Sequence, residues 1–324
     1  FGTALLLGAS GQAISAPSGD LRYGVFIDLR DWDPQTQPNF VYIGPVYEGL
    51  LQIASDGQTP QPGLAESWEL SATELTFKLR RGVTFHDGTP FDADAVVTNI
   101  AAILKRGSSW SDTIAAVKEV IKVDDQTVKL TLKHPDPALP YTFTQSGLSM
   151  VSPKSLADGS VKTAPVGTGP YVYDSTASVS GSKYVFRFYD KYYAPDAIGP
   201  ATIEVSYLPD DAARFNALLS GQLDVAHGDP TQLQVAEGAG FKIHTWTALR
   251  YHLILLDRKE LFGDVRVRKA LCMAMPREQI SVATEEGLAK PATQWVDEGD
   301  PAYVADLKDY AYDIEGAKAL MTEA

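Results

Sequence analysis

The chain has 324 residues, of which 44% are hydrophobic and 21% are charged. This length can bury a sizeable core in more than one compact unit, and the composition excludes wholesale disorder. The formal net charge of −13 at pH 7 would repel phosphate backbones and anionic lipid headgroups, so no nucleic-acid partner is expected.

The chain begins with an apolar run, A-L-L-L-G-A at residues 4–9, which is followed by small residues up to Ala16. This pattern is typical of the end of a signal peptide with its cleavage zone, and it is too short to span a bilayer. We interpret residues 1–16 as a signal peptide remnant and expect an exported protein; a short buried helix is the alternative. The single cysteine, Cys272, allows no disulfide within the chain and is expected to be a small core residue.

The next segment predicts a strand, a loop and a helix. Residues 21–29 (L-R-Y-G-V-F-I-D-L) have the pattern of an opening strand. The loop D-W-D-P-Q-T-Q-P-N-F-V-Y follows. It is expected to lead into a helix through V-Y-E-G-L at residues 46–50. Asp31 and Asp33 could form an acid/base pair, but no partner group lies near them in sequence. We therefore expect these two carboxylates to cap turns.

Residues 75–79 (L-T-F-K-L) alternate apolar and polar side chains, which predicts a half-buried strand. A turn cluster, H-D-G-T-P at 86–90, comes next. Asp92 is placed to cap a helix whose apolar residues recur at helical spacing. We refer to this strand, turn and helix as the platform. We expect Trp68 to be buried in its core and His86 to form a hydrogen bond with a loop.

The remainder of the chain predicts short strands and helices. Strands are expected at 117–123, 127–132, 171–173, 184–189, 201–207, 223–225, 241–247 and 250–256, and helices at 209–220 and after Asp264 and Asp313. The segment G-T-G-P at 167–170 superficially resembles a phosphate-binding loop. No lysine follows it and its proline blocks entry into a helix, so a tight turn is the favoured interpretation.

Several of these strings resemble one protein family. The segment from Pro60 to Asn99, with P-Q-P-G-L-A-E-S-W-E-L and F-H-D-G-T-P-F-D-A-D-A-V-V, resembles the signature region of the extracytoplasmic solute-binding proteins of ABC importers (family 5), which bind peptides, nickel and related solutes. Y-E-G-L-L, A-P-V-G-T-G-P-Y, S-G-Q-L-D-V, D-V-R-V-R-K-A-L and Y-D-I-E-G-A-K-A-L are similar to further family strings. Tyr192-Tyr193 stands where a Tyr-Trp pair is common.

The resemblance implies an α/β fold of two lobes, periplasmic-binding-protein-like and of class II type. Residues 17–50 and 165–250 would form the main sheet of the first lobe, and residues 51–164 an inserted subdomain. Residues 257–324 would begin the second lobe. Family members continue beyond this point, so we expect the second lobe to be truncated in this chain.

The function that the resemblance implies is the substrate-binding component of an ABC importer. Such a protein captures a peptide or similar small solute in the periplasm or another extracytoplasmic space and delivers it to the membrane permease. We expect a monomer without cofactor or metal and without enzyme activity, because no nucleophile–base pair or metal-ligand spacing is visible. The alternatives are a binding protein for a nickel or other metal chelate or an oligosaccharide and, more remotely, a hydrolase.

Aromatic side chains in loops offer large contact areas at low entropy cost, which suits a solute pocket, although each taken alone is more easily explained as core. Motif alignment with the family places ligand-facing positions in the same loops and adds the turn after S-G-Q-L-D-V. The expected ligand-binding residues are Asn39, Phe40, Tyr42, Trp110, His227, Gly228, Asp229, Tyr251 and His252.

Overall fold

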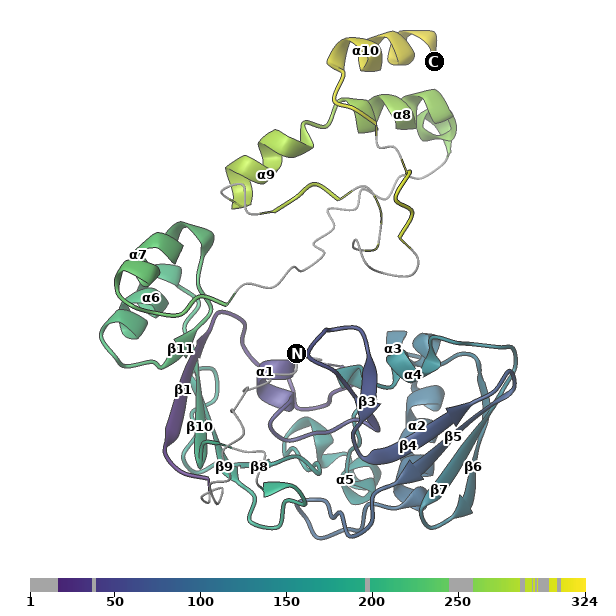
Figure 1. Ribbon diagram of the computed structural model, residues 1–324, viewed down its shortest axis with the longest axis vertical. Coiled ribbons are helices and arrows are strands. Elements are labelled where there is room, and N and C mark those ends of the chain that lie inside the picture. The colour runs from purple at the N-terminus through teal and green to yellow at the C-terminus, as the bar shows by residue number, and fades with distance from the viewer. Residues whose placement is uncertain are drawn as a thin grey trace. The chain divides into compact units, whose positions relative to one another are not determined.

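The computed structural model describes residues 17–36, 39–195, 199–244, 259–285, 289–292, 294, 296, 303–307 and 310–324. Its contacts divide the chain into two compact units, a first that ends at His227 and a second that begins at Gly228 (Figure 1). The signal peptide remnant predicted at 1–16 and the strand predicted at 250–256 lie outside the described residues.

A mixed five-stranded sheet, in the order β11–β1–β10–β9–β8, lies in the first unit. Its strands are β1 (Asp20–Val25), β8 (Tyr171–Tyr173), β9 (Lys183–Phe188), β10 (Thr202–Tyr207) and β11 (Val225–Ala226). Strand β1 is parallel to both β10 and β11, whereas β9 is antiparallel to β10 and to β8. The carboxyl ends of β1, β10 and β11 therefore meet at one edge of this sheet (Figure 1).

A second sheet of the first unit is wholly antiparallel, in the order β4–β5–β7–β6. It consists of β4 (Ala65–Leu70), β5 (Glu74–Leu79), β6 (Val117–Asp124) and β7 (Thr127–Leu132). Leu75, Phe77 and Leu79 are buried, as their alternation predicts. The small sheet of β2 (Leu51–Ile53) and β3 (Pro60–Pro62) precedes it along the chain.

Helix α2 (Ala93–Arg106) packs on this antiparallel sheet. The carboxylate of Asp92 accepts a hydrogen bond from the Ala95 amide at 3.0 Å, so the predicted cap is confirmed. Gly107 ends the helix with a φ of 64°, a left-handed conformation that glycine adopts without steric cost. The shorter helices nearby are α1 (Phe40–Ile43), α3 (Ser109–Thr113), α4 (Leu139–Thr142) and α5 (Pro153–Asp158).

Trp68 differs from its prediction, because it is only partly buried. It packs against the hydrophobic core of the antiparallel sheet, which includes the fully buried Phe77 and Phe143. Strand β4 lies at the edge of the sheet, and most of its residues are exposed. An edge strand has a neighbour on one side alone, so a large side chain on it keeps part of its surface in water.

The G-T-G-P segment lies against the chain near Val46. A Cβ atom on Gly167 would lie 2.1 Å from the Val46 carbonyl oxygen, so only glycine permits this approach. The imidazole of His86 lies with Nε2 2.8 Å from the Gly169 carbonyl oxygen, which confirms the predicted hydrogen bond of His86 to a loop. The segment thus holds the turn after β5 against the end of α1.

The second unit has helices α7 (Leu233–Gly238), α8 (Val265–Met273), α9 (Arg277–Glu285) and α10 (Ile314–Glu323). Asp264 and Asp313 cap α8 and α10 with their carboxylates, as predicted. Cys272 is of intermediate exposure, so the expectation of a core cysteine is only partly met. Residues 241–244 form no strand, which contradicts the part of the predicted strand 241–247 that the structure describes.

Candidate functional site

The carboxyl ends of the parallel strands bring three loops together in the first unit. Phe26 directly follows β1, Leu208 follows β10, and His227 follows β11. In open α/β sheets, ligands bind outside the carboxyl ends of parallel strands. We define the strand-end cluster as Tyr23, Phe26, Ile27, Arg214 and His227 and take it as the candidate site.

His227 lies at the centre of the strand-end cluster. Its Nε2 atom is 2.8 Å from the hydroxyl oxygen of Tyr23, and the two rings meet edge to face with centroids 5.4 Å apart. The Phe26 ring lies on another side, with its centroid 5.3 Å from that of His227. Burial, with a smaller contribution from the positive charge of Arg214, lowers the pKa of His227 below its usual value. The imidazole is therefore neutral at pH 7.

Phe26 and Ile27 present apolar surface, with 42% and 49% of their areas exposed. Hydrogen bonds from two tyrosine hydroxyls fix the loop that carries them. The Tyr42 hydroxyl donates to the Ile27 carbonyl oxygen at 2.8 Å, and the Tyr184 hydroxyl donates to the Asp28 carboxylate at 2.8 Å. Two neighbouring exposed apolar side chains on a fixed loop form a surface that suits the apolar part of a ligand.

The three predicted ligand-binding residues between positions 39 and 42 differ in their exposure and contacts. Asn39 occupies the N-cap position of α1, but its side chain makes no cap hydrogen bond. Phe40 is 44% exposed, and its ring lies close to Gly44. Tyr42 is completely buried, so in this structure it supports the Ile27 loop and offers no surface of its own.

The other predicted residues are distributed over both compact units. Trp110 is partly buried against the core of the antiparallel sheet, and its indole covers Gly147. Gly228 is exposed, and the Asp229 carboxylate accepts a hydrogen bond from the Thr231 amide at 3.0 Å. Tyr251 and His252 lie outside the described residues. Ligand contact by these residues stays a prediction.

Sequence reasoning missed Tyr23, Phe26, Ile27 and Arg214. Phe26 and Ile27 read as the continuation of the first strand, whereas β1 ends at Val25 and leaves both side chains exposed. Arg214 stands inside the predicted helix 209–220, where an arginine normally reaches solvent. Its burial depends on β1 and β11, which lie far from it in sequence, so no local signal could have identified it.

A second polar cluster surrounds Glu48 in the first unit. One carboxylate oxygen accepts hydrogen bonds from the hydroxyls of Tyr192 and Tyr193 at 2.9 and 2.8 Å, and the other accepts from the Thr168 hydroxyl at 3.0 Å. Burial raises the pKa of Glu48, and the three hydroxyl groups oppose this rise. The residue is 8% exposed and its polar partners are all within the fold, so the cluster joins segments and does not face a ligand.

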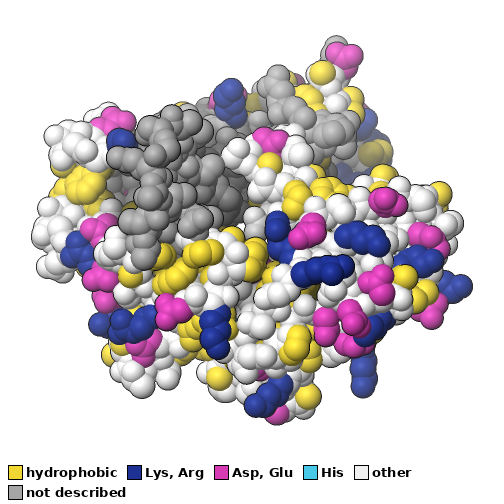
Figure 2. All heavy atoms as spheres, turned by 60° about the horizontal axis from the view of Figure 1, so that its bottom comes forward, with side chains coloured by type: hydrophobic (Ala, Val, Ile, Leu, Met, Phe, Trp, Pro, Cys, Tyr) yellow, Lys and Arg dark blue, Asp and Glu magenta, His cyan; other side chains and the backbone are white. Residues whose placement is uncertain are grey.

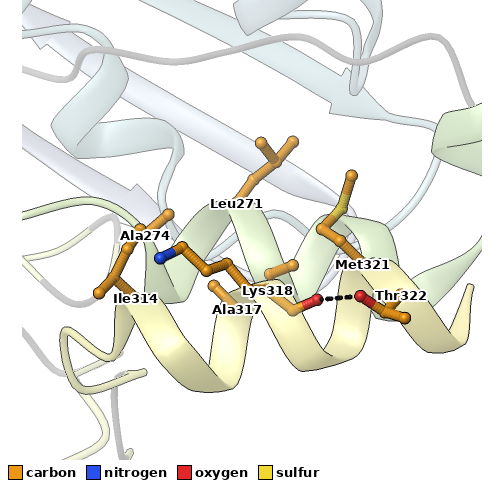
Figure 3. Close-up of a pocket in the computed structure, with 8 residues that line it drawn as sticks. Leu271, Ala274, Ile314, Ala317, Lys318, Met321 and Thr322 are labelled. Carbon is orange, nitrogen blue, oxygen red and sulfur yellow. Dashed lines mark hydrogen bonds between the residues drawn. The ribbon is translucent and has the colours of Figure 1, made fainter.

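An open apolar hollow of about 550 Å³ lies between α8 and α10 in the second unit (Figure 3). It is lined by Ala270, Leu271, Ala274, Ile314, Ala317, Lys318, Met321 and Thr322. The Thr322 hydroxyl donates to the Lys318 carbonyl oxygen at 2.9 Å, as the dashed line shows. Polar groups that converge on one point are needed to orient a solute, and these lining residues do not supply them.

Three features are lacking: a metal-ligand group and a membrane-spanning helix within the described residues, and a continuous basic surface on the face of Figure 2. No group of three or more His, Cys, Asp or Glu side chains that could hold a metal ion occurs there. No helix in the described ranges is long and apolar enough to cross a membrane. On the face drawn in Figure 2, the described Lys and Arg side chains are interspersed with Asp and Glu, so that face has no continuous basic surface for a nucleic acid.

Curated relatives match most of the chain. It is 28% identical over 319 residues to heme-binding protein A of Haemophilus influenzae. This alignment covers 86% of this chain and 56% of the relative. It is 27% identical over 312 residues to the dipeptide-binding protein of Escherichia coli, covering 86% of this chain and 58% of the relative. The chain thus spans just over half the length of these relatives.

Solved structures share the fold. NikZ from Campylobacter jejuni, solved in complex with Ni(L-His), superposes with a TM-score of 0.83 at 25% identity, covering 95% of this chain and 63% of NikZ. The periplasmic binding protein DppA of Helicobacter pylori, solved with the peptide STSA, gives a TM-score of 0.79 at 20% identity over 95% of this chain and 66% of DppA. The predicted α/β fold, two-lobed and periplasmic-binding-protein-like, is confirmed.

A family model described as bacterial extracellular solute-binding proteins, family 5 middle, matches residues 59–324. This range includes the platform around β4 and β5, helix α2, and the strands β8 to β11. It covers well over half of the chain, and it agrees with the family that the sequence motifs resemble. The chain belongs to the bacterial extracellular solute-binding proteins of family 5.

Proposed function

We propose that this chain is the solute-capturing part of an ABC importer and that it takes up a peptide or similar small solute outside the cytoplasmic membrane. It then delivers this solute to the membrane permease, acts as a monomer, and performs no catalytic step. Family membership supports the class of function. The chain spans 56% of heme-binding protein A and 58% of the dipeptide-binding protein, so the solute and the permease belong to the proposal.

The observation that carries the proposal within this chain is the strand-end cluster. It combines the exposed apolar surface of Phe26 and Ile27 with the neutral imidazole of His227, which is held by the Tyr23 hydroxyl. Such a surface can bury an apolar side chain of a solute. Burial raises the pKa of the Tyr23 hydroxyl beside this imidazole, which disfavours the phenolate that nucleophilic catalysis would require.

A peptide is the first candidate because several relatives carry that description, among them the di/tripeptide-binding protein 2 of Pseudomonas aeruginosa, at 28% identity. A metal chelate is the second candidate, since NikZ was solved with Ni(L-His). In a chelate complex the accompanying small molecule can supply the metal ligands, so such a solute requires no metal-binding group in the protein.

Native mass spectrometry of the protein purified from the periplasm of an expressing bacterium would test the proposal. We expect a bound small molecule of peptide composition that is released on denaturation. Calorimetry with unmodified di-, tri- and tetrapeptides should then give saturable binding, and Phe26→Ala should weaken it. A bound metal chelate would favour the second candidate. Turnover of peptide or ester substrates would contradict the proposal of a binding protein without catalysis.

A further inference from the structure

We propose that Arg214 is a positioning residue, whose buried guanidinium holds the loops after β1, β10 and β11 in the arrangement that presents Phe26 and His227 to a solute. This inference rests on the proposed function, because it takes the strand-end cluster to be the solute-binding surface.

Arg214 lies in α6 (Asp211–Leu219), and its side chain is only 2% exposed. The Nε atom donates a hydrogen bond to the His227 carbonyl oxygen at 2.7 Å, and Nη1 donates to the Leu208 carbonyl oxygen at 2.7 Å. Nη2 donates to the carboxylate of Asp211 in the same helix, which compensates the buried charge. One planar group thus joins the segments that follow β10 and β11.

The third loop is held through the Phe26 ring. The guanidinium carbon of Arg214 lies 5.6 Å from the centroid of this ring, which is within the range of a cation–π interaction. The ring also contacts His227. Phe26 therefore rests on two fixed groups while 42% of it stays exposed, so the orientation of its exposed surface depends on Arg214.

The neighbouring strand leaves room for this arrangement. A Cβ atom on Gly24 in β1 would lie 2.5 Å from Leu223 Cδ1 and 3.2 Å from Arg214 Cγ, so the aliphatic part of Arg214 approaches β1 closely because residue 24 is glycine. The guanidinium is consequently set at the strand ends. A lysine would bring a single ammonium group in place of the planar fork and could not reach all of these acceptors at once.

A purely structural role and a positioning role predict different results. If Arg214 only stabilises the fold, its replacement lowers stability but leaves the surroundings of the His227 ring and the affinity of the folded protein unchanged. If Arg214 positions the cluster, the folded variant differs from the wild type both in the surroundings of the His227 ring and in solute affinity. The His227 ring is the reporter, because it contacts Phe26 and follows a carbonyl group that Arg214 holds.

The test compares Arg214→Lys and Arg214→Met with the wild type. The matched control is Arg187→Met, which removes an arginine of β9 that is 58% exposed and pairs with Asp174. The probes are the unmodified tripeptides Ala-Ala-Ala and Ala-Phe-Ala, titrated by calorimetry. The Cε1–H resonance of His227, assigned with His227→Gln, is followed by NMR without ligand.

We expect Arg214→Met to weaken tripeptide binding by about tenfold or more, since the partly buried carbonyl groups of Leu208 and His227 lose a charged donor. The His227 resonance should move, Arg214→Lys should give a smaller change in both measurements, and Arg187→Met should change neither. A folded Arg214→Met protein with an unmoved resonance and wild-type affinity would overturn the proposal. If Arg214→Met does not fold, Arg214→Lys decides by the same two measurements.

Failure of the proposed function would look different. If neither tripeptide binds the wild type, or if Phe26→Ala binds as tightly as the wild type, the assignment of the cluster to peptide binding is wrong. The shift of the His227 resonance still tests whether Arg214 orders the cluster, because this measurement needs no ligand.

Discussion

Arg106, at the C-terminal end of α2, forms an ion pair with the carboxylate of Asp33, whose side chain is completely buried in the loop after β1. The pair joins the helix of the antiparallel sheet to the core of the five-stranded sheet. Asn99 in the same helix makes a second connection, since its side chain bonds both the amide and the carbonyl group of Val151. The five-stranded sheet and the four-stranded antiparallel sheet of the first unit are thus tied by specific polar contacts.

Arg106→Met should lower the free energy of unfolding by about 2–4 kcal/mol, because it leaves the buried carboxylate of Asp33 without its cation. The arginine side chain is 30% exposed, which places the value below that of a fully buried pair. Urea unfolding followed by tryptophan fluorescence, to which Trp32 in the adjoining core contributes, measures this loss. Combining Arg106→Met with Asp33→Asn should recover part of the loss; an equal or larger loss would show that the pair itself is not responsible.

Glu48→Gln should remove a pH dependence of stability. Burial raises the pKa of Glu48 in the folded protein, so the native state holds a proton that the unfolded chain has already released. The stabilisation from this group is complete below the unfolded pKa and is lost as the pH rises through the folded pKa. Melting temperatures of the wild type should therefore fall relative to those of Glu48→Gln from about pH 4 upward. The exposed Glu66→Gln serves as control, and parallel curves for wild type and Glu48→Gln would contradict this expectation.

Trp68→Ala should cost about 1–3 kcal/mol, less than the 3–5 kcal/mol typical of a fully buried large aromatic residue, because Trp68 is only partly buried at the edge of its sheet. Phe77→Ala, on the central strand β5 and completely buried, should cost the full amount. Chemical denaturation of the two variants measures the difference. Solute affinity should be unchanged in Trp68→Ala, and a loss of affinity at unchanged stability would identify Trp68 as part of a binding surface.

Gly167→Ala should destabilise the first unit by about 2 kcal/mol or more, since the added Cβ would lie 2.1 Å from the Val46 carbonyl oxygen and must push two backbone segments apart. Gly199→Ala is the matched control, because no atom lies within 4 Å of the Cβ position there. Thermal unfolding of both variants decides. Equal melting temperatures would show that the two segments separate without cost.

Local sequence patterns predicted several individual elements of this protein. The alternation at residues 75–79 predicted β5, and the carboxylates of Asp92, Asp264 and Asp313 predicted three helix starts. These features depend on the period of side chains along a strand or helix and on hydrogen bonds that span three or four residues. The family motifs are local strings as well, and they predicted the fold that the structural comparisons confirm.

Tertiary structure decided what surrounds the candidate site. Strand β1 pairs with β10 and β11, whose residues lie about two hundred positions later, and only this pairing brings Phe26, Arg214 and His227 into contact. Burial was decided in the same way: Tyr42 is enclosed, whereas Phe26 is left exposed where its strand ends. Which strands become neighbours depends on the free energy gained when distant segments bury hydrophobic surface against each other. This contribution leaves no periodic pattern in the local sequence, so it could not be predicted from one.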